Sequence, residues 1–450
     1  MTRSIAFELL RRVSEDDSYA NLLLPKLLDD ARVDSRDAGF IQELSFGAIR
    51  NRLFYEKVIE EAASREVKGI DANALLVLLL GAHQLLGMRV PVHAAINETV
   101  NLAKAVAGKS TVGFINAVLR RISERSRDQW IDVVTESCKS SEEVLSITHS
   151  HPLWIVRALK AALESRGIAN SLEELLIADN VPAKVSIVAL PGFSEVEKLS
   201  EYGEPGLASP LAIELSTTPG NVPEIREGVA RVQDQGSQLA VLALLSAGIS
   251  IRDSLWLDVC AGPGGKAALM AAIGKQRGVD FEANESSQHR AKLVEQALRP
   301  ITDAKVNVGD GRDIASTGPR FSRILLDAPC TGLGALRRRP EARWRKSAAD
   351  LPDLTKLQRE LFATCWDALL PGGVLGYVTC SPHLSETTAL VSWAEARIGS
   401  SLELLPANRI LNDINPSLAL DESFKTAQLW PHLNGTDAMF IALIRKKVNS

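Results

Sequence analysis

Apolar residues recur three and four positions apart along the first 125 residues of the chain. They include Leu22, Leu23, Leu24, Leu27 and Leu28, and then Phe40, Ile41, Leu44 and Ile49. Residues with this spacing share one face of a helix. Strand signals are few in this part of the sequence. The pattern therefore predicts a compact all-α domain, which we place at residues 1–140.

The pattern changes in the second half of the chain, where short apolar runs alternate with amphipathic segments. The predicted strands are residues 254–260, 279–283, 304–308, 322–328, 373–380 and 439–445, and the predicted helices are residues 266–274, 287–298, 353–370 and 385–397. Such alternation is typical of a doubly wound parallel sheet, which binds its ligand at the carboxyl ends of the strands. We expect an α/β domain at residues 229–450 and a mixed linking subdomain at residues 141–228.

Composition narrows the class of protein. The chain has 450 residues, 46% of them apolar and 24% charged, as in an ordinary globular protein of two or three domains. No stretch approaches the roughly 20 apolar residues of a membrane span, and the amino terminus becomes charged too early for a signal peptide. Five scattered cysteines form neither a disulfide framework nor a metal site. We expect a cytoplasmic monomer without a metal or a membrane contact.

A glycine-rich turn follows the first predicted strand of the α/β domain. It reads Cys260, Ala261, Gly262, Pro263, Gly264, Gly265 and Lys266. Glycines let the backbone approach a ligand closely, and the following helix points free N–H groups at it. The spacing excludes a P-loop. A dinucleotide fingerprint can be forced onto the turn, so the loop alone leaves a nicotinamide site and an S-adenosylmethionine (SAM) site about equally supported.

Later strand ends favour SAM. Glu285 follows the second strand, where an acidic side chain would hold ribose hydroxyls, and Asp310 follows the third, near the expected adenine. Either carboxylate could instead cap the next helix. Two further strand ends carry cysteines, with Asp327 and Cys330 after one and Cys380 after the other. Dehydrogenase chemistry does not need these thiols.

The cysteines indicate what is methylated. Carbon 5 of a pyrimidine is a poor nucleophile until a thiolate adds to carbon 6. Either Cys380 or Cys330 could supply that thiolate, and Asp327 could hold the ring nitrogen edge and, if protonated, act as a general acid. His383 could serve as a base, although a capping or packing role fits a histidine there better.

A basic segment lies between the two cysteines. Residues 336–346 contain six cations, one anion and an aromatic side chain. A run of charge is usually a solvated surface, but this one adjoins the expected catalytic strand end, and its side chains could contact phosphates and stack on a base. We therefore predict RNA contacts from Arg337, Arg338, Arg339, Arg343, Trp344 and Arg345.

Together these motifs resemble the NOL/NOP2/Sun family of RNA cytosine-5 methyltransferases. The matching segments are Cys260 to Lys266, Asp327-Ala-Pro-Cys330, Arg338-Arg-Pro-Glu-Ala-Arg-Trp344, and Thr379-Cys-Ser381 with Glu386. The resemblance implies a Rossmann-like class I SAM-dependent methyltransferase core behind a NusB-like RNA-binding domain. It departs from the family pattern at Gly262, at Glu285 and in the middle domain, where an arginine-containing strand motif is not evident.

The resemblance also implies how the site works. Cys380 would be the nucleophile, and Cys330 would aid release of the methylated RNA. SAM would be held by residues 260–266 with Glu285, Asp310 and Asp327. The implied substrate is the cytidine at position 967 of 16S rRNA, in the small ribosomal subunit. Two alternatives remain: the same chemistry on tRNA, and a non-catalytic RNA-binding or ribosome-assembly factor.

Overall fold

The computed structural model describes residues 1–16, 19–301, 304–318 and 320–448. The chain forms two compact units. The first contains Met1–Val181 and Leu336–Ser347, and the second contains Pro182–Ala335 and Ala348–Ser450. This is a coarser division than the three domains expected at residues 1–140, 141–228 and 229–450, which stay a prediction. No boundary falls near residue 140, and a segment from the second half of the sequence belongs to the first unit.

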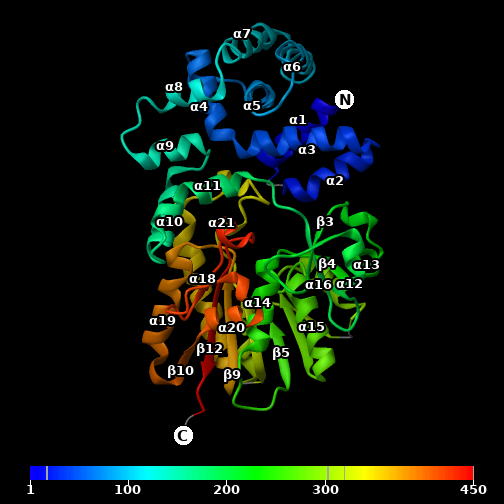
Figure 1. Ribbon diagram of the computed structural model, residues 1–450, viewed down its shortest axis with the longest axis vertical. Coiled ribbons are helices and arrows are strands. Elements are labelled where there is room, and N and C mark those ends of the chain that lie inside the picture. The colour runs from blue at the N-terminus through cyan, green and yellow to red at the C-terminus, as the bar shows by residue number, and fades with distance from the viewer. Residues whose placement is uncertain (17–18, 302–303, 319, 449–450) are drawn as a thin grey trace. The chain divides into compact units, whose positions relative to one another are not determined.

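The first unit is all-helical (Figure 1). Its helices of five or more residues are α1 (Thr2–Glu15), α2 (Ala20–Asp30), α3 (Ser35–Arg50), α4 (Arg52–Ala63), α5 (Ala72–Leu86), α6 (Val92–Val106), α7 (Val112–Ile122), α8 (Arg127–Thr135), α9 (Ser141–Thr148), α10 (Leu153–Glu164) and α11 (Leu172–Asn180). Except for Leu22, which is exposed, the apolar residues named from the sequence lie in or against one core, in which Phe54, Tyr55 and Trp130 are among the largest buried side chains. Within the described ranges, no helix of either unit has the length and hydropathy needed to cross a membrane.

Residues 336–347 complete the first unit. They include the short helix α17 (Ala342–Arg345), and Trp344 packs against the core of the first unit. Both ends of this segment continue into the second unit, so the chain passes between the units three times.

The second unit begins with a small antiparallel sheet. Its strands are β1 (Ser186–Ala189), β2 (Gly203–Pro205), β3 (Ala212–Leu215) and β4 (Ala230–Val232), in the order β2-β3-β1-β4. Alternate residues of β1 face different cores, because Val188 joins the core of the large sheet whereas Ile187 packs in a separate cluster. The short helices α12 (Val196–Leu199) and α13 (Pro223–Glu227) connect these strands.

The large sheet has eight strands. In order along the sheet they are β10 (Leu402–Leu405), β12 (Phe440–Lys446), β9 (Leu369–Thr379), β8 (Phe321–Asp327), β5 (Leu255–Asp258), β6 (Asp280–Glu285) and β7 (Lys305–Val308), with β11 (Ala427–Gln428) paired to β12. Strands β5 to β9 are parallel, but β12 runs antiparallel to β9. The expectation of an entirely parallel sheet is therefore wrong at this edge, and β10 and β11 were not predicted from the sequence.

Helices cover both faces of this sheet (Figure 1). The helices are α14 (Gln235–Ser246), α15 (Gly265–Arg277), α16 (Gln288–Leu298), α18 (Leu351–Ala368), α19 (Thr388–Ile398), α20 (Ala407–Ile414) and α21 (Pro431–Asn434). On β8, Leu325 packs in the core that contains α14, α15 and α16, whereas Ile324 and Leu326 pack in the core that contains α18 and α19. Because these strands are buried on both faces, they read as continuous apolar runs in the sequence.

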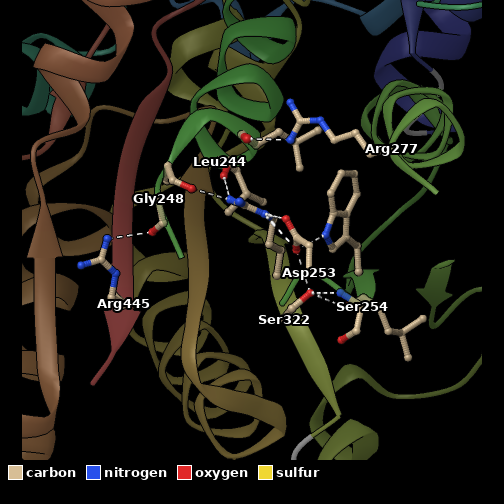
Figure 2. A network of polar contacts seen from close by, with 12 residues as sticks. Leu244, Gly248, Asp253, Ser254, Arg277, Ser322 and Arg445 are labelled. Atoms are coloured by element: carbon tan, nitrogen blue, oxygen red, sulfur yellow. Dashed lines mark hydrogen bonds and ion pairs between the residues drawn. The ribbon is translucent and has the colours of Figure 1, made fainter. Parts of the chain in front are cut away.

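A buried arginine fixes the amino-terminal end of the sheet, opposite the strand ends that carry the motifs. Arg323 pairs with Asp253 at 3.0 Å and donates to the carbonyl oxygen of Ala247 at 2.8 Å. Asp253 also accepts hydrogen bonds from Trp256 and Ser322 (Figure 2). This network holds the loop before β5, so the position of the glycine turn at the other end of β5 is set by a rigid strand.

Candidate active site

The glycine turn joins β5 to α15 and leaves no room for larger side chains. Gly264 has a φ of +106°, and a Cβ atom there would lie 2.6 Å from the Cβ of Ala297. A Cβ on Gly262 would lie 2.4 Å from a carboxylate oxygen of Glu285. The turn therefore needs glycine at Gly264, whereas a Cβ at Gly262 would displace the end of the Glu285 side chain; α15 begins directly behind the turn without a side-chain cap.

Glu285 is the last residue of β6, and its buried carboxylate faces the turn. It accepts hydrogen bonds from the backbone N–H groups of Gly262 and Ser287, each at 3.0 Å. Arg290 approaches the same carboxylate at 3.4 Å. Glu285 thus ties the turn to the second parallel strand, at the place where the sequence predicted a ribose-binding acid.

Asp258, the last residue of β5, is a buried acid to which no role was assigned from the sequence. Its side chain is 1% exposed, and neither carboxylate oxygen has a hydrogen-bond partner among the described residues. Burial, and then the negative charge of Asp327, raise the pKa of Asp258 to about 8, while the ammonium group of Lys266 opposes this shift. An acid without partners beside a glycine cradle fits a ligand that carries an amino group, as the methionine part of SAM does.

Asp310 follows β7 and is more exposed than the other acids. Arg312 pairs with its carboxylate at 2.6 Å and also bonds Glu360 at 2.9 Å. The hydrogen bond from Arg312 lowers the pKa of Asp310. Asp310 is therefore ionised at neutral pH at the end of the third parallel strand.

Lys266 and Asp327 form an ion pair with an N–O distance of 2.8 Å. Burial disfavours the ammonium form of Lys266, but the charge and hydrogen bond of Asp327, followed by Cys380, raise the pKa of Lys266 above its ordinary value. From the sequence, Lys266 was predicted only as part of the SAM-binding turn. Lys266 can also stabilise a thiolate at Cys380, because its positive charge lies close to that sulfur.

The sulfur atoms of Cys330 and Cys380 lie 3.4 Å apart. Their loops follow β8 and β9, which are adjacent parallel strands, so both end at the same edge of the sheet. A hydrogen bond with Cys380 and burial together raise the pKa of Cys330 well above its ordinary value. Cys330 therefore remains a neutral thiol, which can donate its S–H to the sulfur of Cys380.

Two other residues singled out in the sequence, Cys260 and His383, have structural roles. Burial raises the pKa of the Cys260 thiol, so this residue is a poor nucleophile in the wall of the turn. His383 accepts a hydrogen bond from the backbone N–H of Ser385 at 3.1 Å and caps the short helix that begins there. The capping role that we favoured for His383 is therefore confirmed.

The basic segment is placed differently from our expectation. The Arg343 side chain is buried in the first unit and donates to the carbonyl oxygens of Arg50 and Asp179, each at 2.9 Å. Trp344 donates through its indole N–H to the carbonyl of Ile49 at 2.8 Å. A guanidinium with these partners cannot reach a phosphate, so the expectation that Arg343 contacts RNA is corrected to a structural role.

The rest of the segment is less enclosed. The guanidinium groups of Arg339 and Arg345 lie over the ring of Tyr19, and Arg345 also donates to the carbonyl of Val13. Arg339 is exposed, and Arg337, Arg338 and Arg345 are partly exposed. RNA contacts from these four arginines remain a prediction, whereas Trp344 is committed to the helical unit through its indole N–H.

Proteins with methyltransferase names match this chain along most or all of its length. Rv1407 of Mycobacterium tuberculosis strain H37Rv, which carries a provisional methyltransferase name, is 42% identical over 99% of this chain and 96% of its own. Ribosomal RNA small subunit methyltransferase B of Pseudomonas putida is 32% identical over 89% of this chain and 90% of its own. The protein of that name from Pasteurella multocida is 29% identical over 100% and 96%.

Solved structures show the same fold. The crystal structure of PH0851 superposes with a TM-score of 0.79 at 20% identity, covering 99% of this chain and 98% of that one. A methyltransferase homolog protein from Pyrococcus horikoshii superposes with a TM-score of 0.55 at 21% identity, covering 68% of this chain and 99% of that one. The predicted combination of a class I methyltransferase core with an all-helical amino-terminal domain is confirmed.

Family models match both parts of the chain. The model described as 16S rRNA methyltransferase RsmB/F matches residues 250–445, which contain the large sheet and every strand-end motif. The NusB family model matches residues 1–124 in the helical unit. With relatives above 30% identity along most of its length, the chain belongs to the RsmB/F family of SAM-dependent RNA methyltransferases and carries an amino-terminal NusB-family domain.

Proposed function

We propose that this protein transfers a methyl group from SAM to carbon 5 of a cytidine in 16S rRNA, through a covalent adduct between Cys380 and carbon 6. The observation that carries the proposal is the pair of sulfur atoms 3.4 Å apart at the ends of adjacent strands. The Lys266–Asp327 ion pair, whose N–O distance is 2.8 Å, lies at the same edge of the sheet. Two thiols and an ion pair at one strand edge suit a reaction in which one thiol adds and the other helps to reverse the addition.

Each side chain then has a defined task. The Cys380 thiolate forms a bond to carbon 6, and the electrons of the carbon 5–carbon 6 double bond become available at carbon 5. After carbon 5 is methylated and loses its proton to a base, the bond between sulfur and carbon 6 breaks and frees the thiolate. Cys330 aids that release, while Lys266 stabilises the Cys380 thiolate before it adds.

SAM supplies the electrophilic methyl group when it is bound. Residues 260–266 would surround its methionine part, with Asp258 beside the amino group. Glu285 would hold the ribose hydroxyls, Asp310 would lie near the adenine, and Asp327 would contact the cofactor and hold the nitrogen edge of the base. The close packing at Gly262 and Gly264 and the unpartnered carboxylate of Asp258 support this assignment.

The substrate assignment rests on two supports. Relatives of the chain include enzymes named for the small-subunit rRNA, and the NusB-family domain suits a ribosomal RNA substrate better than tRNA. From the family resemblance, we propose the cytidine at position 967 of 16S rRNA as the target. We further propose that the protein acts as a monomer in the cytoplasm, where its free thiols remain reduced.

Bisulfite sequencing of 16S rRNA tests this function. Cells lacking the gene should lose protection of cytidine 967, and the wild-type gene should restore it. Complementation with Cys380→Ser should fail, whereas Cys138→Ser, which changes a thiol in the helical unit, should succeed. Loss of protection at a different rRNA or tRNA site would overturn the substrate, and unchanged protection at every site would favour a non-catalytic RNA-binding protein.

A further inference from the structure

A buried carboxylate connects the loops that carry the two cysteines. The side chain of Glu386 is 0% exposed. One of its oxygens accepts from the backbone N–H of Thr331 at 2.8 Å and the side-chain amide of Gln358 at 3.2 Å. The other accepts from the hydroxyls of Thr331 at 2.5 Å and Ser381 at 2.6 Å. All four donors are neutral groups, so the carboxylate depends on every one of them for its solvation.

The positions of these donors in the sequence show that the network connects the segments next to the two cysteines. Thr331 directly follows Cys330, and Ser381 directly follows Cys380. Gln358 also donates to the carbonyl of Pro329 at 2.8 Å, on the other side of Cys330. The turn that carries Cys330 is therefore held on both sides, and one carboxylate holds this turn and the Cys380 turn together.

Glu386 is itself held in place by a buried tyrosine. The Tyr377 hydroxyl, from inside β9, donates to the backbone carbonyl of Glu386 at 2.7 Å. A second link between the turns runs through the backbone, because Gly334 donates to the carbonyl of Cys380 at 2.8 Å. Rotation of either cysteine turn would thus break bonds to groups that have no route to water.

We propose that Glu386 is a positioning residue that sets the separation between the sulfur atoms of Cys330 and Cys380. The inference rests on the proposed function, because it gives this separation a task. Cys330 must lie against the sulfur of the adduct to aid its release. When the turns drift apart, Cys380 still adds to the base, but the adduct is released slowly. Glu386 itself never touches the substrate.

Three substitutions separate geometry from charge. In Glu386→Gln, the amide oxygen can accept from Thr331 and Gln358, while the amide NH2 donates to the two hydroxyls, which can act as acceptors. Glu386→Asp keeps the charge but is one methylene too short to reach both turns. Glu386→Ala removes the link. We expect Glu386→Gln to resemble the wild type and the other two to be defective.

The separation can be measured without RNA. Phenylarsine oxide condenses with two nearby thiols, forming two arsenic–sulfur bonds and releasing one water molecule. The wild type and Glu386→Gln should bind it with similar affinity, and Cys330→Ala should lose this binding. Glu386→Asp and Glu386→Ala should bind at least tenfold more weakly, with SAM affinity within threefold of the wild type. Equal arsenical affinity in the wild type and Glu386→Asp would overturn the inference, as would a Glu386→Gln variant as defective as Glu386→Ala.

A reaction with substrate RNA and SAM tests the role in catalysis. Glu386→Asp should turn over at least tenfold more slowly than the wild type and leave a larger fraction of protein covalently bound to RNA. If turnover falls without extra adduct, the positioning role is wrong. If wild type and Cys330→Ala neither methylate RNA nor form an adduct, the proposed function fails and takes this role with it, whatever the arsenical titration shows.

Discussion

Arg343 donates a hydrogen bond to the backbone carbonyl of Arg50 at 2.9 Å, across 293 positions of the sequence. It also bonds the side-chain oxygen of Asn180 at 2.8 Å. Burial lowers the pKa of Arg343 to about 9, while the negative charge of Asp179 opposes the shift. A buried guanidinium with so many acceptors holds residues 336–347 in the helical unit.

We predict that Arg343→Ala destabilises the helical unit by about 3–5 kcal/mol, because it leaves buried acceptors without a donor. For a unit of this size, the loss corresponds to a fall in melting temperature of roughly 10 °C. Arg339→Ala, which alters an exposed arginine of the same segment, should change stability by less than about 0.5 kcal/mol. Calorimetry of both variants gives the comparison, and equal melting temperatures would contradict the structural role of Arg343.

Removal of Cys330 should trap the reaction midway. With substrate RNA and SAM, we expect Cys330→Ala to accumulate a protein–RNA adduct that survives denaturing electrophoresis, because Cys380 can still add to carbon 6. The double variant Cys330→Ala/Cys380→Ser should form none. An adduct that persists in the double variant would show that a different residue is the nucleophile.

Glu285 and Glu282 lie on the same strand, three residues apart. Glu282 therefore serves as the control for a test of SAM binding by Glu285. Glu285 faces the glycine turn, whereas Glu282 pairs with Arg320 at 2.7 Å. We predict that Glu285→Gln weakens SAM binding by about 10- to 100-fold, the usual range for losing a hydrogen bond to a charged group. Glu282→Gln should stay within about threefold. Isothermal titration calorimetry measures both constants, and similar losses would mean that strand geometry, not the carboxylate, matters.

Asp258 should make stability depend on pH. Its folded pKa of about 8 lies above the unfolded value of about 4, so between these pH values the folded protein keeps a proton that the unfolded chain has lost. Stability from this group therefore falls as the pH rises from about 4 to about 8.

The variant Asp258→Asn cannot titrate and should lack this fall. Relative to the wild type, it should gain at most about 4 kcal/mol of unfolding free energy between pH 5 and pH 8. Urea unfolding at the two pH values checks this, with Asp280→Asn as an exposed control on the next strand. A stability difference between Asp258→Asn and the wild type that does not change with pH would contradict the buried, partnerless state of Asp258.

The strand-end residues could be located from the sequence because their signals are local. Asp258, Glu285, Asp327 and Cys380 each end or directly follow an apolar run, and parallel strands bring their carboxyl ends to one edge. The apolar runs and their spacing along the chain therefore suffice to predict that these residues lie together. The reversed direction of β12 has no such signal, because an apolar run reads the same in a parallel and an antiparallel neighbour.

The buried side chains of the connecting segments could not be located in this way. Arg343 stands in a run of cations that reads as a surface, and its partners Arg50, Ser150 and Asp179 lie more than 160 positions away. Glu386 likewise bonds Thr331, 55 positions earlier. Long-range pairing of polar groups leaves no periodic pattern, so only the folded chain reveals it.

Residues 336–347 also mean that the two units cannot be separated by a single cut. A fragment ending at residue 181 would lack Arg343 and Trp344, and its core would have empty sites where they belong. A fragment starting at residue 182 would carry residues 336–347 as a loop whose apolar and cationic side chains lack the helical core that they contact in the full chain. A gene fusion or domain exchange that transfers the helical unit therefore has to move residues 1–181 and 336–347 together, because the second half of the sequence holds a part of the first unit's fold.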